Sequence, residues 1–357
     1  MKKYILMMLV VLAAGFASCS NDDIPMEENV TKKVFETTFI VDPSGVVEPY
    51  RFEWEAGELS IVPDGAQLRL RILIYDSNGE IVGNILTKKQ SNYQSTWSEK
   101  TDLEVGTYTA FVISDVINTN DPDVEEYWKL ENYGRLNDAK LTKTPRFLGY
   151  QKEILGICIQ QFSVESINSS ISFDLKPAGA ACYYILLNNE PYPVDLWFNS
   201  NMEIQSIFWD ASYNLKSEKE LSDICEYNLG GAGLPAEYVH SSFVYLLPTK
   251  NQHFRFWAET EENQGFVGND MTIADIKAGE QYFFYCDFSS LFDNYGFTEY
   301  YNVTGKTFDE WFEEWLWELR SKGYQNSRLK NMPNKMTTPM LMNSMHNSVY
   351  VKDLINE

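Results

Sequence analysis

The chain has 357 residues, with 51 Asp plus Glu against 29 Lys plus Arg, so its formal net charge is −22. This length allows one to three domains with cores of their own, and a hydrophobic content of 44% excludes wholesale disorder. The acidic balance argues against a nucleic-acid partner, because a phosphate-binding face needs clustered basic residues.

The first eighteen residues have the pattern of a signal peptide. Lys2 and Lys3 give a basic start, Tyr4 to Phe16 is an uncharged apolar run, and the small pair Ala17-Ser18 follows it. The run is shorter than the roughly 20 apolar residues that a membrane-spanning helix needs. We therefore expect residues 1–18 to be removed from the mature protein.

Cys19 stands directly after that small pair. The segment Phe16-Ala17-Ser18-Cys19 resembles the lipobox of bacterial lipoproteins. The resemblance implies that the Cys19 sulfur carries a diacylglycerol, that its amine carries an acyl chain such as palmitate, and that Cys19 is the mature N-terminus. Such a double lipid signal suffices for stable anchoring without a spanning segment. The alternative is an ordinary secretory signal followed by a chance cysteine.

Residues 19–30 form an acidic tether. Ser20, Asn21, Asp22 and Asp23 resemble the signal that sends Bacteroidetes lipoproteins to the outer face of the outer membrane. The alternative is a plain solvated spacer, since the segment is polar and contains a proline. The localisation expected from the resemblance is the outer membrane, lipid-anchored, on the extracellular side.

The body of the chain reads as one strand after another. Leu68, Leu70, Ile72 and Ile74 alternate with mostly polar residues, which predicts one face on a core and the other in water. The following Asp76-Ser77-Asn78-Gly79 predicts a hairpin turn. Because no helical crossovers separate the strands, the pattern predicts an all-β fold of antiparallel β-sandwiches.

Two pairs of similar short segments, here called echoes, suggest that the sandwich occurs twice. Pro63-Asp64-Gly65-Ala66 and Pro177-Ala178-Gly179-Ala180 each precede a strand, and so do two later segments that end in Gly106 and Gly279. The echoes come in the same order in both halves, which favours a tandem repeat. We expect an N-terminal β-sandwich over residues 31–165 and a C-terminal β-sandwich over residues 166–300, divided by a polar stretch.

Together these features resemble a known family. The lipobox, the tether, Tyr75 to Gly79, Leu103 to Tyr108 and the strand Ile171 to Leu175 look like the fimbrillin-type anchor lipoproteins of Bacteroidales. The resemblance covers roughly residues 16 to 290. It implies two transthyretin-like or Ig-like sandwiches, a position at the cell surface, and a part in fimbrial assembly or adhesion.

Residues 301–357 do not look like that family. Thr307-Phe308-Asp309-Glu310 has the form of a capping box, and Phe308, Trp311 and Trp315 begin an apolar stripe at helical spacing. We expect an amphipathic C-terminal helix that packs across a sandwich face or closes an open sheet edge, with partner binding as the alternative. A Met- and Asn-rich tail follows, and Ser348 to Val351 is expected to form a short terminal strand.

The sequence offers little support for chemistry. The three histidines have no close neighbour that would form a zinc site, and neither a nucleophile motif nor a phosphate loop is present. The acidic loop from Asn118 to Glu126 lacks the form of a calcium loop and is taken as solvated. We expect a non-enzymatic protein with no metal and no cofactor apart from the covalent lipid.

Four cysteines remain after Cys19. Cys182 and Cys286 lie inside apolar strands, where a free thiol serves as a small core residue. We expect buried thiols here and name Cys182 to Cys286 as the disulfide to test first; Cys158 and Cys225 stay open.

Aromatic residues raise a second functional class. Sugars stack on exposed rings, and Trp97, Tyr127, Trp128 and Trp209 are the candidates for such contacts with a ligand or partner, although each could equally belong to a core. The favoured function is cell adhesion or fimbrial anchoring and assembly, with fimbrial subunits or host ligands as partners. The alternative is a surface glycan-binding lipoprotein of a polysaccharide-utilisation system.

Overall fold

The structure of the chain is a computed structural model. It describes residues 33–50, 62, 66–117, 127–143, 153–165, 169–188, 191–236, 238–259, 267–287, 298–307, 310, 311, 313, 314, 317 and 349–350. Within this part the expected all-β class is confirmed, since the described residues lie mainly in strands β1 to β21, with two short 3-10 segments, η1 (Ser44–Val46) and η2 (Leu136–Asp138).

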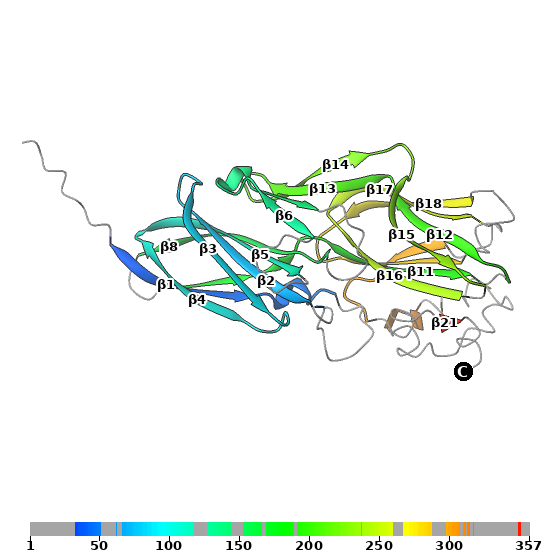
Figure 1. Cartoon of the computed structure of the whole chain (residues 1–357), viewed down its shortest axis with the longest axis horizontal. Coiled ribbons are helices and arrows are strands. Elements are labelled where there is room, and N and C mark those ends of the chain that lie inside the picture. The colour runs from blue at the N-terminus through cyan, green and yellow to red at the C-terminus, as the bar shows by residue number, and fades with distance from the viewer. Residues whose placement is uncertain are drawn as a thin grey trace, which may run out of the picture.

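The N-terminal lobe is a β-sandwich of two sheets (Figure 1). Sheet A has the order β4-β1-β9, and sheet B has the order β10-β8-β5-β2-β3. Phe39 and Phe173 of sheet A meet Phe162 of sheet B, with ring centroids 5.7 and 6.3 Å apart. The strands are β1 (Val34–Asp42), β2 (Gln67–Tyr75), β3 (Ile81–Gln90), β4 (Trp97–Glu104), β5 (Gly106–Ile117), β8 (Gly156–Val164), β9 (Ser169–Asp174) and β10 (Lys176–Pro177).

The C-terminal lobe is built in the same way from two further sheets. Sheet C has the order β20-β19-β11-β16-β21, and sheet D has the order β15-β12-β17-β18. Phe284 of sheet C packs on Phe198 of sheet D, with ring centroids 4.7 Å apart. The strands are β11 (Ala180–Asn188), β12 (Val194–Ser200), β15 (Tyr227–Leu234), β16 (Tyr238–Leu246), β17 (Thr249–Glu259), β18 (Val267–Ile276), β19 (Gln281–Asp287), β20 (Thr298–Asn302) and β21 (Val349–Tyr350).

The two lobes repeat one strand plan. In the first lobe β1 lies between an antiparallel partner, β4, and a parallel partner, β9. In the second, β11 lies between antiparallel β16 and parallel β19. The facing sheets also correspond, because β8-β5-β2-β3 matches β18-β17-β12-β15 position by position.

Each lobe carries one insertion into this plan, and the insertions pair with each other. The first is β6 (Trp128–Glu131) with β7 (Lys140–Lys143), and the second is the hairpin of β13 (Met202–Trp209) with β14 (Leu215–Leu221). They join in a sheet of order β14-β13-β7-β6, here called the shared sheet, in which Ser206 and Ile207 pair with Thr142 and Leu141. In Figure 1 the shared sheet lies over the junction of the lobes.

The shared sheet covers the outer face of sheet B. Trp209 on β13 packs against Phe111 on β5 with ring centroids 4.2 Å apart. Leu68 and Leu70 lie in the core as expected. On the face predicted to meet water, however, Arg69 and Leu73 are buried, at 2% and 1% exposure, and Gln67 and Arg71 are half-buried. That prediction was wrong because a third layer, invisible in the alternation of one strand, packs there.

The expected division between the sandwiches differs from the structure. Residues 169–174 were expected to open the C-terminal β-sandwich, but as β9 they pair with β1 in sheet A. The two echoes also equate strands that the topology does not, since β2 corresponds to β12 and not to β11. Turns with proline and glycine can precede any strand, so they do not identify which one follows.

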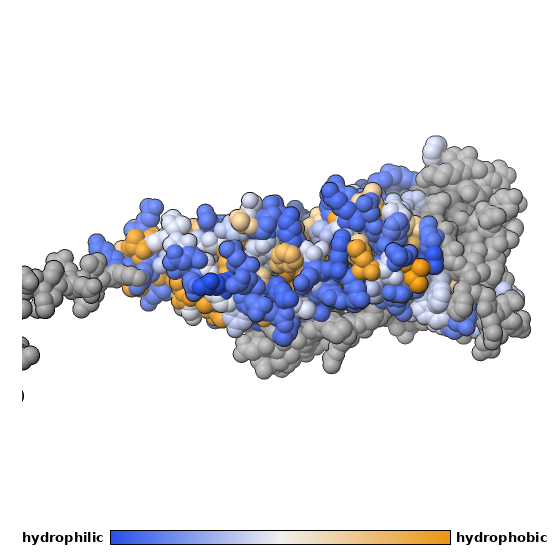
Figure 2. Space-filling view, turned by 90° about the horizontal axis from the view of Figure 1, so that it is seen from above, coloured by the Kyte–Doolittle hydropathy of each residue, from blue (hydrophilic) through white to orange (hydrophobic). Residues whose placement is uncertain are grey.

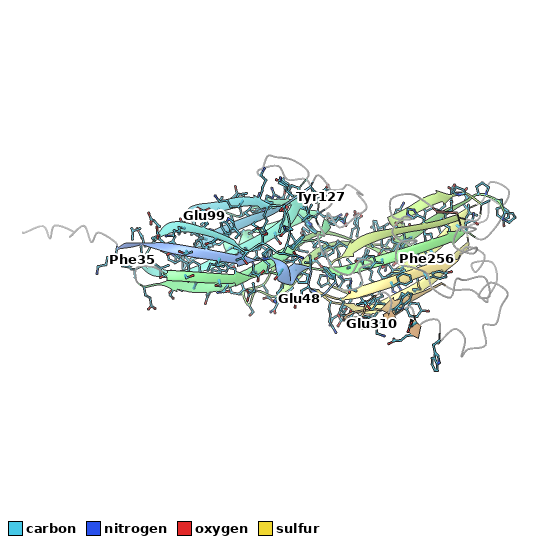
Figure 3. The ribbon with its side chains drawn as sticks, turned by 90° about the horizontal axis from the view of Figure 1, so that it is seen from below. Phe35, Glu48, Glu99, Tyr127, Phe256 and Glu310 are labelled. Carbon is cyan, nitrogen blue, oxygen red and sulfur yellow. The ribbon has the colours of Figure 1, made fainter. Side chains whose placement is uncertain are left out.

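A second contact between the lobes surrounds Gly179, in the link from β10 to β11. Tyr50 donates a hydrogen bond of 2.7 Å to its carbonyl oxygen, and its N–H donates one of 2.6 Å to the Tyr245 hydroxyl. Tyr245 in turn donates to the Leu155 carbonyl at 3.1 Å. A Cβ on Gly179 would lie 2.6 Å from the Leu246 carbonyl oxygen, so only glycine fits this approach. Figure 3 places Glu48 at the same junction between the lobes.

Two local predictions are confirmed. Asp76 accepts hydrogen bonds from the N–H groups of Asn78 and Glu80 in the β2–β3 turn, where Gly79 has φ +76°. Thr307 and Glu310 form a reciprocal capping box, because each backbone N–H donates to the other's side chain.

The expected C-terminal helix is described only in part. Residues 310, 311, 313, 314 and 317 are helical, and the rest of the expected helix lies outside the described residues. Trp311 is buried against Phe283 of β19 and Tyr301 of β20, with centroids 4.4 and 5.6 Å away. This part of the segment therefore packs across the outer face of sheet C. The expected terminal strand is present as β21, which pairs with β16.

The four described cysteines are free thiols, and Cys182 and Cys286 are fully buried in the core. In the parallel pairing of β11 with β19, Cys182 lies opposite Tyr282, and Cys286 lies opposite Leu186. The two thiols are thus offset by four positions, about 13 Å along the strands. A disulfide between them, which we named as the first to test, is ruled out by this register.

Candidate functional site: the groove between the lobes

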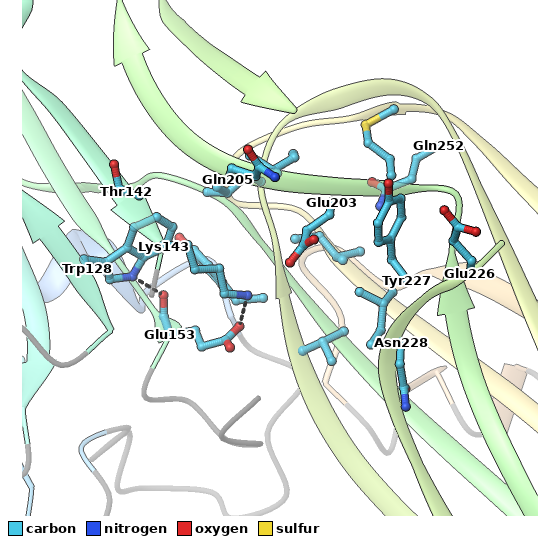
Figure 4. Close-up of a pocket in the computed structure, with 17 residues that line it drawn as sticks. Trp128, Thr142, Lys143, Glu153, Glu203, Gln205, Glu226, Tyr227, Asn228 and Gln252 are labelled. Atoms are coloured by element: carbon cyan, nitrogen blue, oxygen red, sulfur yellow. Dashed lines mark hydrogen bonds and ion pairs between the residues drawn. The ribbon is translucent and has the colours of Figure 1, made fainter. Parts of the chain in front are cut away.

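A groove with a volume of about 610 Å³ lies where the shared sheet meets the C-terminal lobe. Figure 4 shows one wall from the first insertion, with Trp128 and Lys143, and the opposite wall from β13 and β15, with Glu203 and Tyr227. Gln252 of β17 also lines it. The volume is in the range of ordinary ligand sites.

The wall from the first insertion is internally satisfied. Lys143 Nζ lies 2.9 Å from Glu153 Oε2 in an ion pair. The Trp128 indole N–H donates a hydrogen bond of 3.0 Å to the Glu153 carbonyl oxygen. These contacts neutralise the charge of Lys143 and Glu153 on this side of the groove.

The opposite wall carries carboxylates without described cationic partners. Glu203 on β13 lies directly across from Glu220 on β14, and Glu226 precedes β15. Among the ion pairs of the described residues, none includes these three side chains. Like charges that face each other across a strand pair are unfavourable, so this wall holds a concentrated negative charge.

Tyr227 lies within that negative field and is half-buried. Desolvation, followed by the carboxylates of Glu220 and Glu226, raises the pKa of Tyr227, and Glu203 acts in the same direction. The phenol therefore stays neutral and presents an aromatic ring beside the acidic groups.

Gln252 supplies a buried acceptor with no partner. The residue is 3% exposed, and its Nε2 donates a 2.8 Å hydrogen bond to Ser200 Oγ. The Ser200 hydroxyl donates its proton to the Met202 carbonyl oxygen, so it can only accept from Gln252. This fixes Nε2, and not Oε1, of Gln252 as the atom that faces Ser200. The remaining atom, Gln252 Oε1, has no hydrogen-bond partner in the structure. Such a group normally marks a place where another donor binds.

Three of the expected aromatic contact residues are buried. Tyr127, Trp128 and Trp209 are 3%, 1% and 4% exposed, and Trp97 is half-buried at the start of β4. Only Trp128 lines the groove, with its edge engaged by Glu153. These buried rings offer no open platform for a sugar.

The other expected site residues lie outside the described residues. Cys19 and the segment Ser20, Asn21, Asp22 and Asp23 are among them, as is the acidic loop from Asn118 to Glu126. In the part of the chain that the structure describes, no helix has the length and apolar character to cross a bilayer. The same part holds no cluster of three His, Cys, Asp or Glu side chains arranged to bind a metal ion.

The groove residues could not be singled out from the sequence. Glu203, Glu226, Tyr227 and Gln252 are four unremarkable members of a chain with 51 acidic residues and 22 tyrosines. They meet only because β13 leaves the C-terminal lobe to join the shared sheet. No local motif signals that event.

The surface above the shared sheet is mainly hydrophilic. Figure 2 shows this face with small, separate apolar areas among polar residues. Isolated apolar residues are ordinary on a protein surface. The face in that view therefore presents no broad apolar patch beside the groove.

No protein-family model matches the chain, and no curated protein matches its sequence. Its structural neighbours include the fimbrial anchor protein Mfa2 from Porphyromonas gingivalis, at 10% identity and a TM-score of 0.40, covering 75% of this chain and 95% of that one. A fimbrial assembly protein from Parabacteroides distasonis has 10% identity and a TM-score of 0.39, with coverage of 71% and 91%. A candidate adhesin from Bacteroides thetaiotaomicron has 11% identity and a TM-score of 0.40, with coverage of 72% and 93%. These three neighbours are fimbrial and adhesin proteins of Bacteroidales. Another neighbour, from Bacteroides thetaiotaomicron, is described as a polysaccharide-binding protein and has 10% identity and a TM-score of 0.42, with coverage of 72% and 92%.

Proposed function

We propose that the protein is a non-enzymatic, lipid-anchored protein of the outer-membrane surface that acts in adhesion or in fimbrial anchoring and assembly. In this proposal Cys19 carries the lipid, Ser20 to Asp23 direct export to the extracellular face, and the two lobes are tandem transthyretin-like sandwiches. The helix after Thr307 closes the outer face of sheet C.

The observation that carries the proposal is the shared sheet. Backbone pairing between β7 and β13 joins the lobes into one elongated body, with β1 starting at the end away from the C-terminal lobe (Figure 1). If the N-terminal tether is attached to the membrane, and if the shared sheet keeps the two lobes from moving relative to each other, the C-terminal lobe is held at a fixed distance from the tether. That is a mechanical task, and it requires no catalytic group.

The anchor is tested by replacing Cys19 with serine in the producing cell. We expect the wild-type protein to partition into the detergent phase of a cloud-point extraction and to be cleaved by protease added to intact cells. The Cys19→Ser protein should leave the membrane fraction. Unchanged partitioning of the variant would remove the lipid from the proposal.

The partner is tested by isolating the lipidated protein from surface extracts and identifying what copurifies. Fimbrial subunits are the expected result. A polysaccharide array on the same preparation examines the glycan-binding alternative. The burial of Tyr127, Trp128 and Trp209 weighs against that alternative, and saturable glycan binding would favour it over ours.

A further inference from the structure

We propose that the groove between the lobes binds an arginine side chain of a polypeptide partner. This deepens the proposed role in adhesion or assembly and rests on it for the partner being a protein. The argument uses the charge of the groove, its hydrogen-bonding groups and the half-buried ring of Tyr227.

The charge of the groove requires a cation. Glu203 and Glu226 line it, Glu220 lies across from Glu203, and the only lysine among the lining residues, Lys143, is already paired with Glu153. A neutral sugar would leave this negative charge uncompensated, and an acidic one would be repelled. A basic ligand relieves the repulsion between Glu203 and Glu220, so its binding gains more than the contact energy alone.

The charged hydrogen-bonding groups on the C-terminal side are carboxylates, which accept hydrogen bonds. Glu203 and Glu226 offer carboxylate oxygens, and Gln252 offers a buried amide oxygen that no group in the structure satisfies. A ligand that satisfies these three groups must bring several N–H donors. The guanidinium group has five such donors in a fixed plane and carries its charge at every physiological pH.

The ring of Tyr227 selects a planar cation. It lines the groove between Glu226 and Asn228 in the chain and stays neutral for the reason given above. A guanidinium plane stacks on such a ring while its edges reach the carboxylates, whereas an ammonium group acts as a point charge. The groove therefore favours arginine over lysine.

The test measures binding of short peptides to the full-length protein by calorimetry at low and moderate salt. The probes are acetylated, amidated tripeptides with a central arginine, lysine or citrulline; citrulline keeps the shape of arginine without its charge. We expect the arginine peptide to bind at least about tenfold more tightly than citrulline and several-fold more tightly than lysine, with affinity falling as salt rises. Equal binding of arginine and citrulline would overturn the proposal, and equal binding of lysine would overturn the guanidinium assignment.

Variants locate the binding site. Glu203→Gln with Glu226→Gln should abolish the preference for arginine, and Tyr227→Leu should reduce it several-fold. The matched control is Asp102→Asn with Glu165→Gln, which removes two exposed carboxylates from the N-terminal lobe. We expect the control to bind as the wild type does, and a loss of binding in it equal to that in the groove variant would overturn the proposal.

Both double variants should fold, because they change only exposed side chains. Unfolding curves check this, and we expect the groove variant to be at least as stable as the wild type since it removes the repulsion at Glu203. If the peptides fail to bind while fimbrial subunits still copurify with the lipidated protein, the groove assignment falls and the proposed function stands.

Discussion

An ion pair is buried on the outer face of sheet B. Arg69 Nε and the terminal NH2 lie 2.8 and 2.6 Å from the two carboxylate oxygens of Asp115, and both side chains are 3% exposed. The two residues face each other across β2 and β5. Two charges taken out of water in this way need close pairing to offset the loss of hydration.

Replacing Asp115 with Asn should destabilise the protein by about 3–5 kcal/mol, because it removes the carboxylate that neutralises a buried arginine. Urea unfolding followed by tryptophan fluorescence measures this. The control is Arg255→Gln, which breaks a similar two-pronged pair with Asp270 whose side chains are 33% and 57% exposed; it should cost about 0.2–1 kcal/mol. Equal losses in the two variants would contradict the role of burial.

His240 makes stability depend on pH. Desolvation on β16 lowers the pKa of His240 below its ordinary value of 6.5. Below pH 6.5 the unfolded chain therefore binds more protons than the folded one, so stability is complete above that pH and is lost as the pH falls toward the folded pKa. Titration of this one group can change the unfolding free energy by at most about 1.4 kcal/mol per pH unit.

A His240→Gln variant should lack this dependence. Between pH 7.5 and 5.5 we expect its unfolding free energy to change less than that of the wild type, whereas above pH 7.5 the two curves should run in parallel. Parallel curves over the whole range would show that His240 is not the group that titrates.

At the scale of elements, the hairpin of β13 and β14 connects the lobes. Its turn repeats the Asp76 design, with Asp210 accepting from the N–H groups of Ser212 and Asn214. Tyr213, however, takes the left-handed position at φ +61°, and its hydroxyl lies 3.4 Å from the Thr109 hydroxyl on the N-terminal lobe. A tyrosine accepts that backbone strain here because its ring docks on the neighbouring lobe.

Replacing Trp209 with Ala should cost about 3–5 kcal/mol, because it removes a buried ring between the hairpin and sheet B. We also expect the lobes to unfold in two steps instead of one, which differential scanning calorimetry resolves. Trp317→Ala is the control, since this tryptophan is 72% exposed and should change stability by less than about 0.5 kcal/mol. A single transition in the Trp209 variant would show that other contacts couple the lobes.

The sequence predicted what depends on neighbours along the chain. The inward residues of β2, the Asp76 turn and the Thr307 capping box all follow from local spacing. The shared sheet, the burial of Arg69 and the acidic wall of the groove depend on strands far apart in sequence. Residues 169–174 show the limit most clearly, because their strand pattern is right while their partner, β1, could not be read from it.

At the scale of the whole molecule, the two insertions make one body of two lobes. Thr142 of β7 and Ser206 of β13 lie directly opposite each other in the shared sheet. Their α-carbons are therefore within the range that a disulfide bridges.

Cysteines at these two positions, Thr142→Cys and Ser206→Cys, should form a disulfide on mild oxidation. We expect the oxidised variant to be about 2–4 kcal/mol more stable than its own reduced form, with the same radius of gyration in X-ray scattering. The reduced form serves as the control, since it shares both substitutions. Failure to oxidise, or a change in dimensions on oxidation, would contradict a permanent junction.

The shared sheet also sets an order of events during synthesis. Phe111 is synthesised long before Trp209, whose ring packs on it. On the nascent chain, the outer face of sheet B therefore lacks this covering ring until the second insertion emerges. Apolar surface that is exposed during this interval is prone to aggregate with other chains. A chaperone that guards newly made β proteins should therefore hold on until residue 221 has appeared, and chains truncated before residue 202 should aggregate even though every strand of the first lobe is present.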